Sequence, residues 1–272
     1  MKHLDYPKVD FHVHAFPDQL AQRALQTLVE TYGVPAITDG TISGLIRHMK
    51  GSGVDYSVVQ PVATKPSQVR NINEWAAQVA DPAIVCFGAI HPDCDSITDE
   101  IEHIISLGLP GIKIQSNWQG TYPDDPKMYP IYEAAQGKLI VMFHAGNELA
   151  FIEDVKATPQ RLANVHRDFP RLTMIAAHMG GYKMWDEAER HLVGKSIYFD
   201  TSACFCDDLS NEQLLALIRR HGAERVLFAT DSPFGDAKRD IARLLALGLT
   251  DEELELIFWK NAKFLLNEHL NH

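Results

Sequence analysis

The chain has 272 residues, of which 46% are hydrophobic and 22% are charged. This is the composition of a globular protein and excludes a disordered, fibrous or disulfide-stapled one. With 25 Lys and Arg against 36 Asp and Glu, the formal net charge is −11, which argues against nucleic acid as the main partner.

The N-terminal sequence MKHLDYPKVDFHVH lacks the apolar segment of a secretory signal, and no run of about 18 apolar residues would span a membrane. The four cysteines include the pair Cys204 and Cys206, which is not a CxxC motif. So few thiols are typical of a reducing compartment. We therefore expect a cytoplasmic protein with a small-molecule partner, no nucleic-acid or membrane partner, and a homodimer as one open assembly state.

Eight short runs rich in apolar and β-branched residues recur along the chain, each followed by a turn and a helical pattern. They cover residues 8–14, 55–61, 84–91, 111–115, 139–144, 172–178, 196–200 and 226–231. The helices between them carry N-terminal signals: capping-box spacing at Ser210 with Gln213 and at Thr250 with Glu253, and Thr158 before Pro159.

Strands that alternate with helices pair in parallel, because each helix returns the chain in the same strand direction. Continuous apolar strands such as 139–143 are typical of sheets covered on both faces. We therefore predict an α/β fold, a single (β/α)8 TIM barrel over residues 1–272, with an open doubly wound sheet as the alternative. No glycine-rich phosphate loop follows the first strand, which disfavours a nucleotide-binding open sheet.

Five polar side chains follow apolar runs at the carboxyl ends of predicted strands, where barrel active sites are built. They are His12, His14, His144, His178 and Asp231. Because His12 and His14 are two residues apart, a pleated strand points both to one face, with Cα atoms about 6.6 Å apart. A lone HxH often arises by chance and a lone histidine is more often structural, but the joint pattern predicts a divalent-metal site.

The segments VDFHVH, GIKI, FHAG, AAHMGG, FDTSA and ATDSP together resemble the amidohydrolase superfamily of TIM-barrel metal-dependent hydrolases. The resemblance covers nearly the whole chain, from Val9 to Asn261–Ala262. It is strongest to the amidohydrolase 2 branch, which includes aminocarboxymuconate-semialdehyde decarboxylase and γ-resorcylate decarboxylase.

The resemblance implies a role for each polar strand-end residue. His12, His14, His144 and Asp231 would be metal ligands, His178 would lie beside the metal-bound water, and Asp231 would also move a proton. Zinc suits these ligands best, while Mn2+ and Fe2+ accept the same set. One ion is favoured, with two as the alternative.

Lys113, on the fourth predicted strand, has three alternative roles. It would contact substrate as a free ammonium beside one metal, or bridge two metals as a carbamylated lysine, with His178 ligating the second ion. The third alternative is a structural lysine paired with Asp10 or Asp200.

Several further residues are weaker candidates. His91 would contact substrate or cap a loop, and Asp200 and Ser202 would support the metal ligands through hydrogen bonds. Four residues are expected near the mouth of the barrel: Trp118, Gln119, Tyr122 and Glu148.

The leading functional hypothesis is a metal-dependent hydrolase of a small amide, ester or lactone, in which Asp231 and His178 move protons. The alternative is a non-oxidative decarboxylase of a carboxylated aromatic or muconate-like compound at the same metal. A TatD-like phosphoesterase is disfavoured, because that class usually has a glutamate where this chain has Lys113. A barrel that only binds a ligand is disfavoured, because all five site positions are intact.

Overall fold

The computed structural model describes residues 6–204 and 208–270, so Cys206 and both chain ends lie outside the described residues. The chain forms two compact units that interleave in sequence. The terminal unit comprises Met1–Val59, Asp81–Val85 and Asp200–His272, and the central unit comprises Gln60–Ala80 and Cys86–Phe199. The expectation of one domain over residues 1–272 stays a prediction.

The terminal unit is built around parallel strands at the N-terminal side of the chain. Strand β1 (Val9–Val13) pairs in parallel with β2 (Tyr56–Val59), and β3 (Ile84–Cys86) follows β2 in the same sheet. On the other side of β1, the segment that begins with β9 (Val226–Leu227) donates and accepts backbone hydrogen bonds along β1. The ends of β1 and of this last segment therefore lie side by side.

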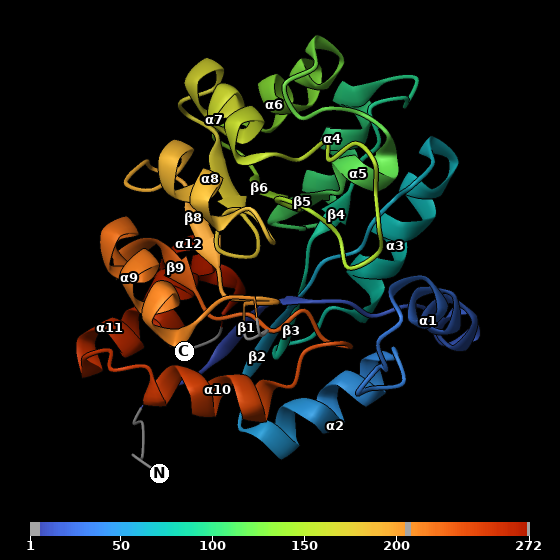
Figure 1. The fold of residues 1–272 in the computed structure, drawn as a ribbon. Coiled ribbons are helices and arrows are strands. Elements are labelled where there is room, and N and C mark those ends of the chain that lie inside the picture. The colour runs from blue at the N-terminus through green and yellow to red at the C-terminus, as the bar shows by residue number, and fades with distance from the viewer. Residues whose placement is uncertain (1–5, 205–207, 271–272) are drawn as a thin grey trace. The chain divides into compact units, whose positions relative to one another are not determined.

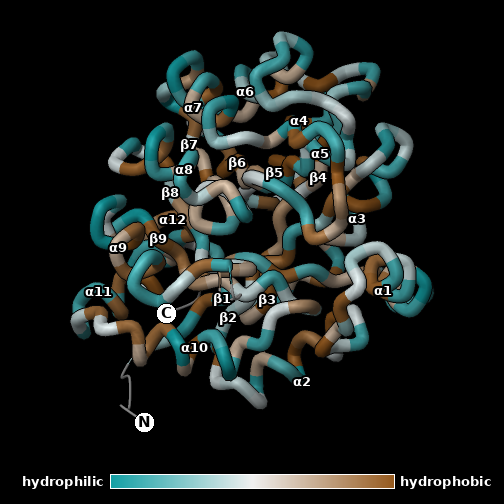
Figure 2. Tube along the Cα trace, viewed as in Figure 1, coloured by the Kyte–Doolittle hydropathy of each residue, from teal (hydrophilic) through white to brown (hydrophobic). Residues whose placement is uncertain are grey.

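Helices cover the strands of the terminal unit (Figure 1). They are α1 (Asp18–Tyr32), α2 (Ile42–Ser52), α9 (Asn211–His221), α10 (Ala237–Ala246), α11 (Asp251–Glu255) and α12 (Asn261–Leu266), with a π-helical turn at Leu256–Lys260. Both predicted capping boxes are confirmed, at the start of α9 and of α11. Along α2 and α10, hydrophilic and hydrophobic stretches alternate (Figure 2), as in helices with one buried face.

The central unit contains five consecutive parallel strands and their helices (Figure 1). The strands are β4 (Gly88–Ala89), β5 (Gly111–Ile114), β6 (Ile140–Phe143), β7 (Thr173–Ala176) and β8 (Tyr198–Asp200), whose last residue is assigned to the terminal unit. The helices are α3 (Val69–Val79), α4 (Ile97–Ser106), α5 (Ser116–Gln119), α6 (Tyr129–Ala135), α7 (Pro159–Asp168) and α8 (Trp185–His191). Thr158 caps α7 as predicted.

Each of the eight predicted runs contains an observed strand, and every observed strand is shorter than predicted. The run 84–91 is divided at Phe87 into β3 and β4. Beside the break, the Asn73 side chain bonds both the N–H and the C=O of Ala89 and so occupies groups that a longer ladder would use. Within the run 226–231 only Val226–Leu227 is a strand, and at the end of the run Asp231 has a φ of 66°, outside the extended conformation.

Each unit buries apolar strand residues: Phe11 of β1 is fully inaccessible in the terminal unit, as are Ile112, Val141 and Ile175 of β5, β6 and β7 in the central unit. Among the described residues, no helix combines the length and the apolar character needed to cross a membrane.

Candidate metal centre

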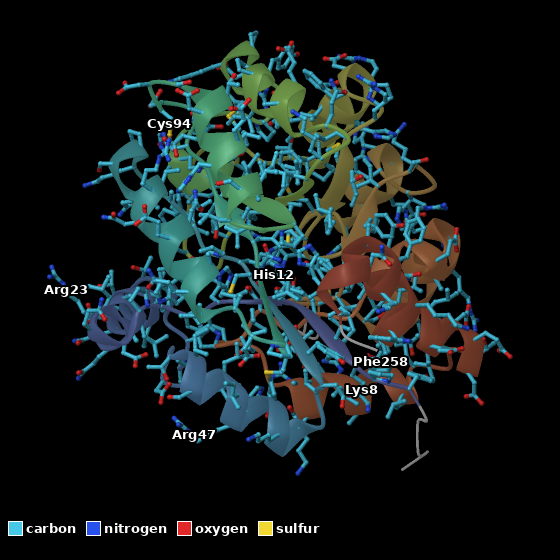
Figure 3. The ribbon with its side chains drawn as sticks, turned by 180° about the vertical axis from the view of Figure 1, so that it is seen from behind. Lys8, His12, Arg23, Arg47, Cys94 and Phe258 are labelled. Atoms are coloured by element: carbon cyan, nitrogen blue, oxygen red, sulfur yellow. The ribbon has the colours of Figure 1, made fainter. Side chains whose placement is uncertain are left out.

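The HxH motif lies at the carboxyl end of β1. The rings of His12 and His14 are 5.1 Å apart, which confirms that the strand presents both to one side. His12 lies in the interior, whereas Arg23 on α1 and Arg47 on α2 point outward (Figure 3). The His14 side chain is 23% exposed, whereas that of His12 is only 1% exposed.

Asp231 brings a carboxylate to the same two imidazoles. Its backbone N–H donates to the carbonyl oxygen of His12 at 2.9 Å, and its left-handed φ turns the side chain back across the end of β1. Oδ1 of Asp231 lies 3.1 Å from Nε2 of His14 and 3.5 Å from Nε2 of His12. The three side chains therefore offer two nitrogens and one oxygen within 4.8 Å of one another.

This donor set fits a divalent transition metal. Two neutral imidazoles and one carboxylate form a ligand set that catalytic zinc sites use, and non-haem iron sites use the same combination. The structure therefore brings these three residues together, and their role as metal ligands stays a prediction.

Asp200 and Ser202 support His12 from behind, as the sequence analysis expects. Nδ1 of His12 lies 2.9 Å from Oδ2 of Asp200 and 3.2 Å from Oγ of Ser202. Both the backbone N–H and the hydroxyl of Ser202 donate to Asp200, which is fully buried. A proton held on Nδ1 by the carboxylate leaves the lone pair of His12 on Nε2, the atom that faces Asp231.

Asp10 is a buried acid in this neighbourhood that sequence reasoning considered only as a partner for Lys113. Its carboxylate accepts hydrogen bonds from the backbone N–H and the hydroxyl of Thr230, at 3.0 and 2.6 Å. Burial raises the pKa of Asp10 to about 8. Because Thr230 directly precedes Asp231, these bonds hold the carboxylate ligand segment against β1.

The central unit contributes a second pair of histidines. His144 follows β6 and His178 follows β7, and Nε2 of His178 lies 3.1 Å from Nδ1 of His144. His178 has a φ of 59°, and the turn that holds it there is fastened by a hydrogen bond from the Trp185 indole to the carbonyl oxygen of His178. Both imidazoles are buried, at 7% and 3% exposure.

Polar side chains surround His144 on the side away from His178. Nε2 of His144 lies 2.9 Å from the carbonyl oxygen of Asn147 and 3.1 Å from Oε1 of Glu148. The same oxygen of Glu148 accepts from the amides of Gln115 and Asn117. The spacing from His144 predicted that Glu148 lies near this site. Gln115 and Asn117 were not predicted, because amide side chains are common in loops and carry no specific signal in the sequence.

The remaining candidates have mixed outcomes. Lys113 lies on β5 and is buried at 2% exposure, and its three alternative roles stay predictions. Nδ1 of His91 accepts the backbone N–H of Asp93, the bond of a loop cap. Gln119 donates to two backbone carbonyls and therefore joins loops, while Tyr122 donates to Asp154.

Within each unit, the predicted residues lie together: His12, His14 and Asp231 in the terminal unit, His144 and His178 in the central unit. The four-ligand set that includes His144, and the catalytic roles of Asp231, His178 and Lys113, stay predictions.

Comparison with known proteins gives both sequence and structural likenesses. A family model described as amidohydrolase matches residues 9–267. The decarboxylase orsB of Emericella nidulans is 27% identical over 130 residues, which is 40% of this chain and 38% of that protein.

Two solved structures show the fold. The 5-carboxyvanillate decarboxylase of Novosphingobium aromaticivorans, bound to manganese and 4-hydroxy-3-methoxy-5-nitrobenzoic acid, is 15% identical, with 97% of each chain covered and a TM-score of 0.75. A Pseudomonas putida protein provisionally assigned as a 2-pyrone-4,6-dicarboxylic acid hydrolase is 18% identical, with 99% of this chain and 100% of that one covered and a TM-score of 0.68. The predicted (β/α)8 fold class is confirmed by such likenesses.

Proposed function

The chain belongs to the amidohydrolase family, and from that membership we propose that it is a metal-dependent, non-oxidative decarboxylase of a small carboxylated aromatic compound. The observation that carries the proposal is the cluster of His12, His14 and Asp231, which offers a divalent ion three donor atoms. A sequence relative and a structural relative that are both named decarboxylases favour this reaction over the hydrolysis that the sequence analysis ranked first.

His12, His14 and Asp231 would hold the metal, and we propose His144 as a further ligand, as the sequence analysis expects. When bound, a divalent cation supplies a Lewis acid that polarises an oxygen of the substrate. The donor set accepts zinc, which the sequence analysis favours, and equally manganese, which the decarboxylase from Novosphingobium aromaticivorans binds.

The reaction needs one proton and no oxidant. The bond between the ring carbon and the carboxylate breaks, its electron pair stays on the ring carbon, carbon dioxide leaves, and a proton takes its place. Asp231 and His178 are the groups that we propose to move this proton, since both can gain and lose one and Asp231 is 22% exposed. Asp200 and Ser202 keep His12 oriented throughout, because their bonds occupy its other nitrogen.

A second candidate is hydrolysis of a carboxylated lactone. It is favoured by the likeness to the Pseudomonas putida protein that is provisionally assigned as a 2-pyrone-4,6-dicarboxylic acid hydrolase. Because that compound and 5-carboxyvanillate are both carboxylated six-membered rings, the two candidates share one substrate class: a small ring acid.

The test measures the products directly. Protein stripped of metal and reloaded with zinc or manganese is incubated with 5-carboxyvanillate, 2,6-dihydroxybenzoate and 2-pyrone-4,6-dicarboxylate, and both carbon dioxide and ring-opened acid are measured. We expect a carboxylated phenol to release carbon dioxide, and chelation of the metal to abolish this release. Asp231→Asn should lower the rate of release by more than the roughly 10–100-fold that is typical of a residue outside the ligand sphere. Exposed Asp18, at the start of α1, provides the matched control Asp18→Asn. Ring-opened acid without carbon dioxide would establish the lactonase instead.

A further inference from the structure

The loop after β6 folds back onto the histidine that precedes it. We propose that Glu148, together with the backbone carbonyl of Asn147, is a positioning residue that fixes the tautomer of His144, with the proton on Nε2 and the lone pair on Nδ1 for a metal ion. The inference rests on the proposed function in one respect, which is that His144 binds metal.

Two oxygen acceptors face Nε2 of His144. A carbonyl oxygen cannot donate, and that of Asn147 lies 2.9 Å from Nε2. Oε1 of Glu148 lies 3.1 Å from the same nitrogen. A neutral imidazole carries one N–H and one lone pair, so a nitrogen that faces two oxygens is stabilised as the N–H.

Oε1 of Glu148 is itself an acceptor and not a hydroxyl, because two side-chain amides donate to it. Nε2 of Gln115 donates to it at 3.1 Å and Nδ2 of Asn117 at 2.8 Å. The orientation of the Asn117 amide is set independently, because its oxygen accepts the backbone N–H groups of Lys156 and Ala157. Glu148 is only 6% exposed, and its Oε1 already accepts from two amides. This oxygen is therefore held as an acceptor for the N–H of His144.

The backbone of the turn at Gly146 keeps both acceptors in place. Gly146 has a φ of +85° and pairs with Tyr182, whose N–H donates to Ala145 and whose carbonyl accepts from Asn147. The turn is therefore fastened to the loop after β7 on both sides of Gly146. Asn147 and Glu148 reach the imidazole three and four residues after His144 because this turn reverses the chain.

The tautomer of His144 determines which of its ring nitrogens can bind a metal ion. With the proton on Nε2, Nδ1 is the only nitrogen of His144 with a lone pair, and in this structure it faces Nε2 of His178 at 3.1 Å. The His144 imidazole would therefore bind a metal through Nδ1, on the side that faces His178. Histidine ligands are generally oriented by an acceptor on the other ring nitrogen, and a carboxylate there also increases ligand basicity.

The test reads the tautomer and the metal affinity, and neither requires turnover. Metal-free protein labelled with 15N-histidine is examined by NMR at about pH 8, where an ordinary imidazole is neutral, and the His144 signals are assigned with His144→Gln. We expect Nε2 protonated and Nδ1 unprotonated. In Glu148→Gln we expect the opposite tautomer to gain population and the affinity for zinc, measured by chelator competition, to fall about 10–100-fold.

Glu153→Gln makes the same chemical change at an exposed position of the same loop and should leave both readings at wild-type values. A wild-type His144 that carries its proton on Nδ1 would overturn the inference. So would wild-type zinc affinity in Glu148→Gln, or a wild-type protein that binds no zinc. A protein that passes these tests but decarboxylates no ring acid would refute the proposed function alone.

Discussion

Replacing Gly146 with alanine perturbs the turn that carries Asn147 and Glu148 back to His144. Gly146 has a φ of +85°, and a Cβ at this position would lie 2.5 Å from the backbone oxygen of Tyr182 and closer still to its nitrogen. Backbone atoms in a paired segment cannot rotate away as a flexible side chain can. The substitution must therefore move the turn or strain it.

The expected loss of stability in Gly146→Ala has two parts, which a matched variant separates. The left-handed conformation costs an L-residue about 1–2 kcal/mol, and forcing an extra carbon into a packed site costs about 1–3 kcal/mol. Gly120 has nearly the same φ, +71°, but open space where its Cβ would lie. Gly120→Ala should therefore lose only the first part, and Gly146→Ala about 1–3 kcal/mol more.

The assay is thermal unfolding of both metal-free variants, followed by zinc titration. At about 2–4 °C per kcal/mol for a chain of this size, Gly146→Ala should melt roughly 2–12 °C below Gly120→Ala. We also expect weaker zinc binding in Gly146→Ala alone, because the two acceptors of the His144 N–H move with the turn. Equal melting temperatures for the two variants would refute the steric argument.

Three further predictions concern the acceptor that orients His12, the effect of zinc on stability, and one buried acid. Asp200→Asn removes the charged acceptor at Nδ1 of His12, so zinc affinity should fall about 10–100-fold in a competition titration, and an unchanged affinity would contradict the supporting role. Zinc at 100 times its Kd should stabilise the protein by about 2.7 kcal/mol, and a melting temperature that does not rise with zinc speaks against a site in the folded state. Burial raises the pKa of Asp240 from 3.8 to about 6, so the folded protein holds this proton more tightly than the unfolded chain does. The contribution of Asp240 to the free energy of unfolding is therefore largest at acid pH and falls by roughly 3 kcal/mol as the pH rises from about 4 through 6. In Asp240→Asn, the free energy of unfolding measured in urea should change less over this pH range. The same pH dependence in the variant and the wild type would contradict this prediction.

Much of the candidate site could be predicted from local sequence periodicity. The pleat of a strand puts residues i and i+2 on one face, so the HxH motif alone indicated that His12 and His14 share a side. The alternation of strands and helices indicated parallel pairing, and with it the expectation that residues at strand ends gather at one edge. The helix starts at Thr158, Ser210 and Thr250 followed from side-chain caps that act within three residues.

What the sequence determined by itself was therefore local: the strands, their caps and the residues that end them. Only the tertiary structure decided how those residues meet. The carboxylate of Asp231 reaches both imidazoles because its backbone adopts a left-handed conformation beside β1. Asp200 orients His12, and Tyr182 fastens the turn before Glu148, across long stretches of chain. Such contacts depend on packing and on the closure of long loops, which no spacing rule in the sequence encodes.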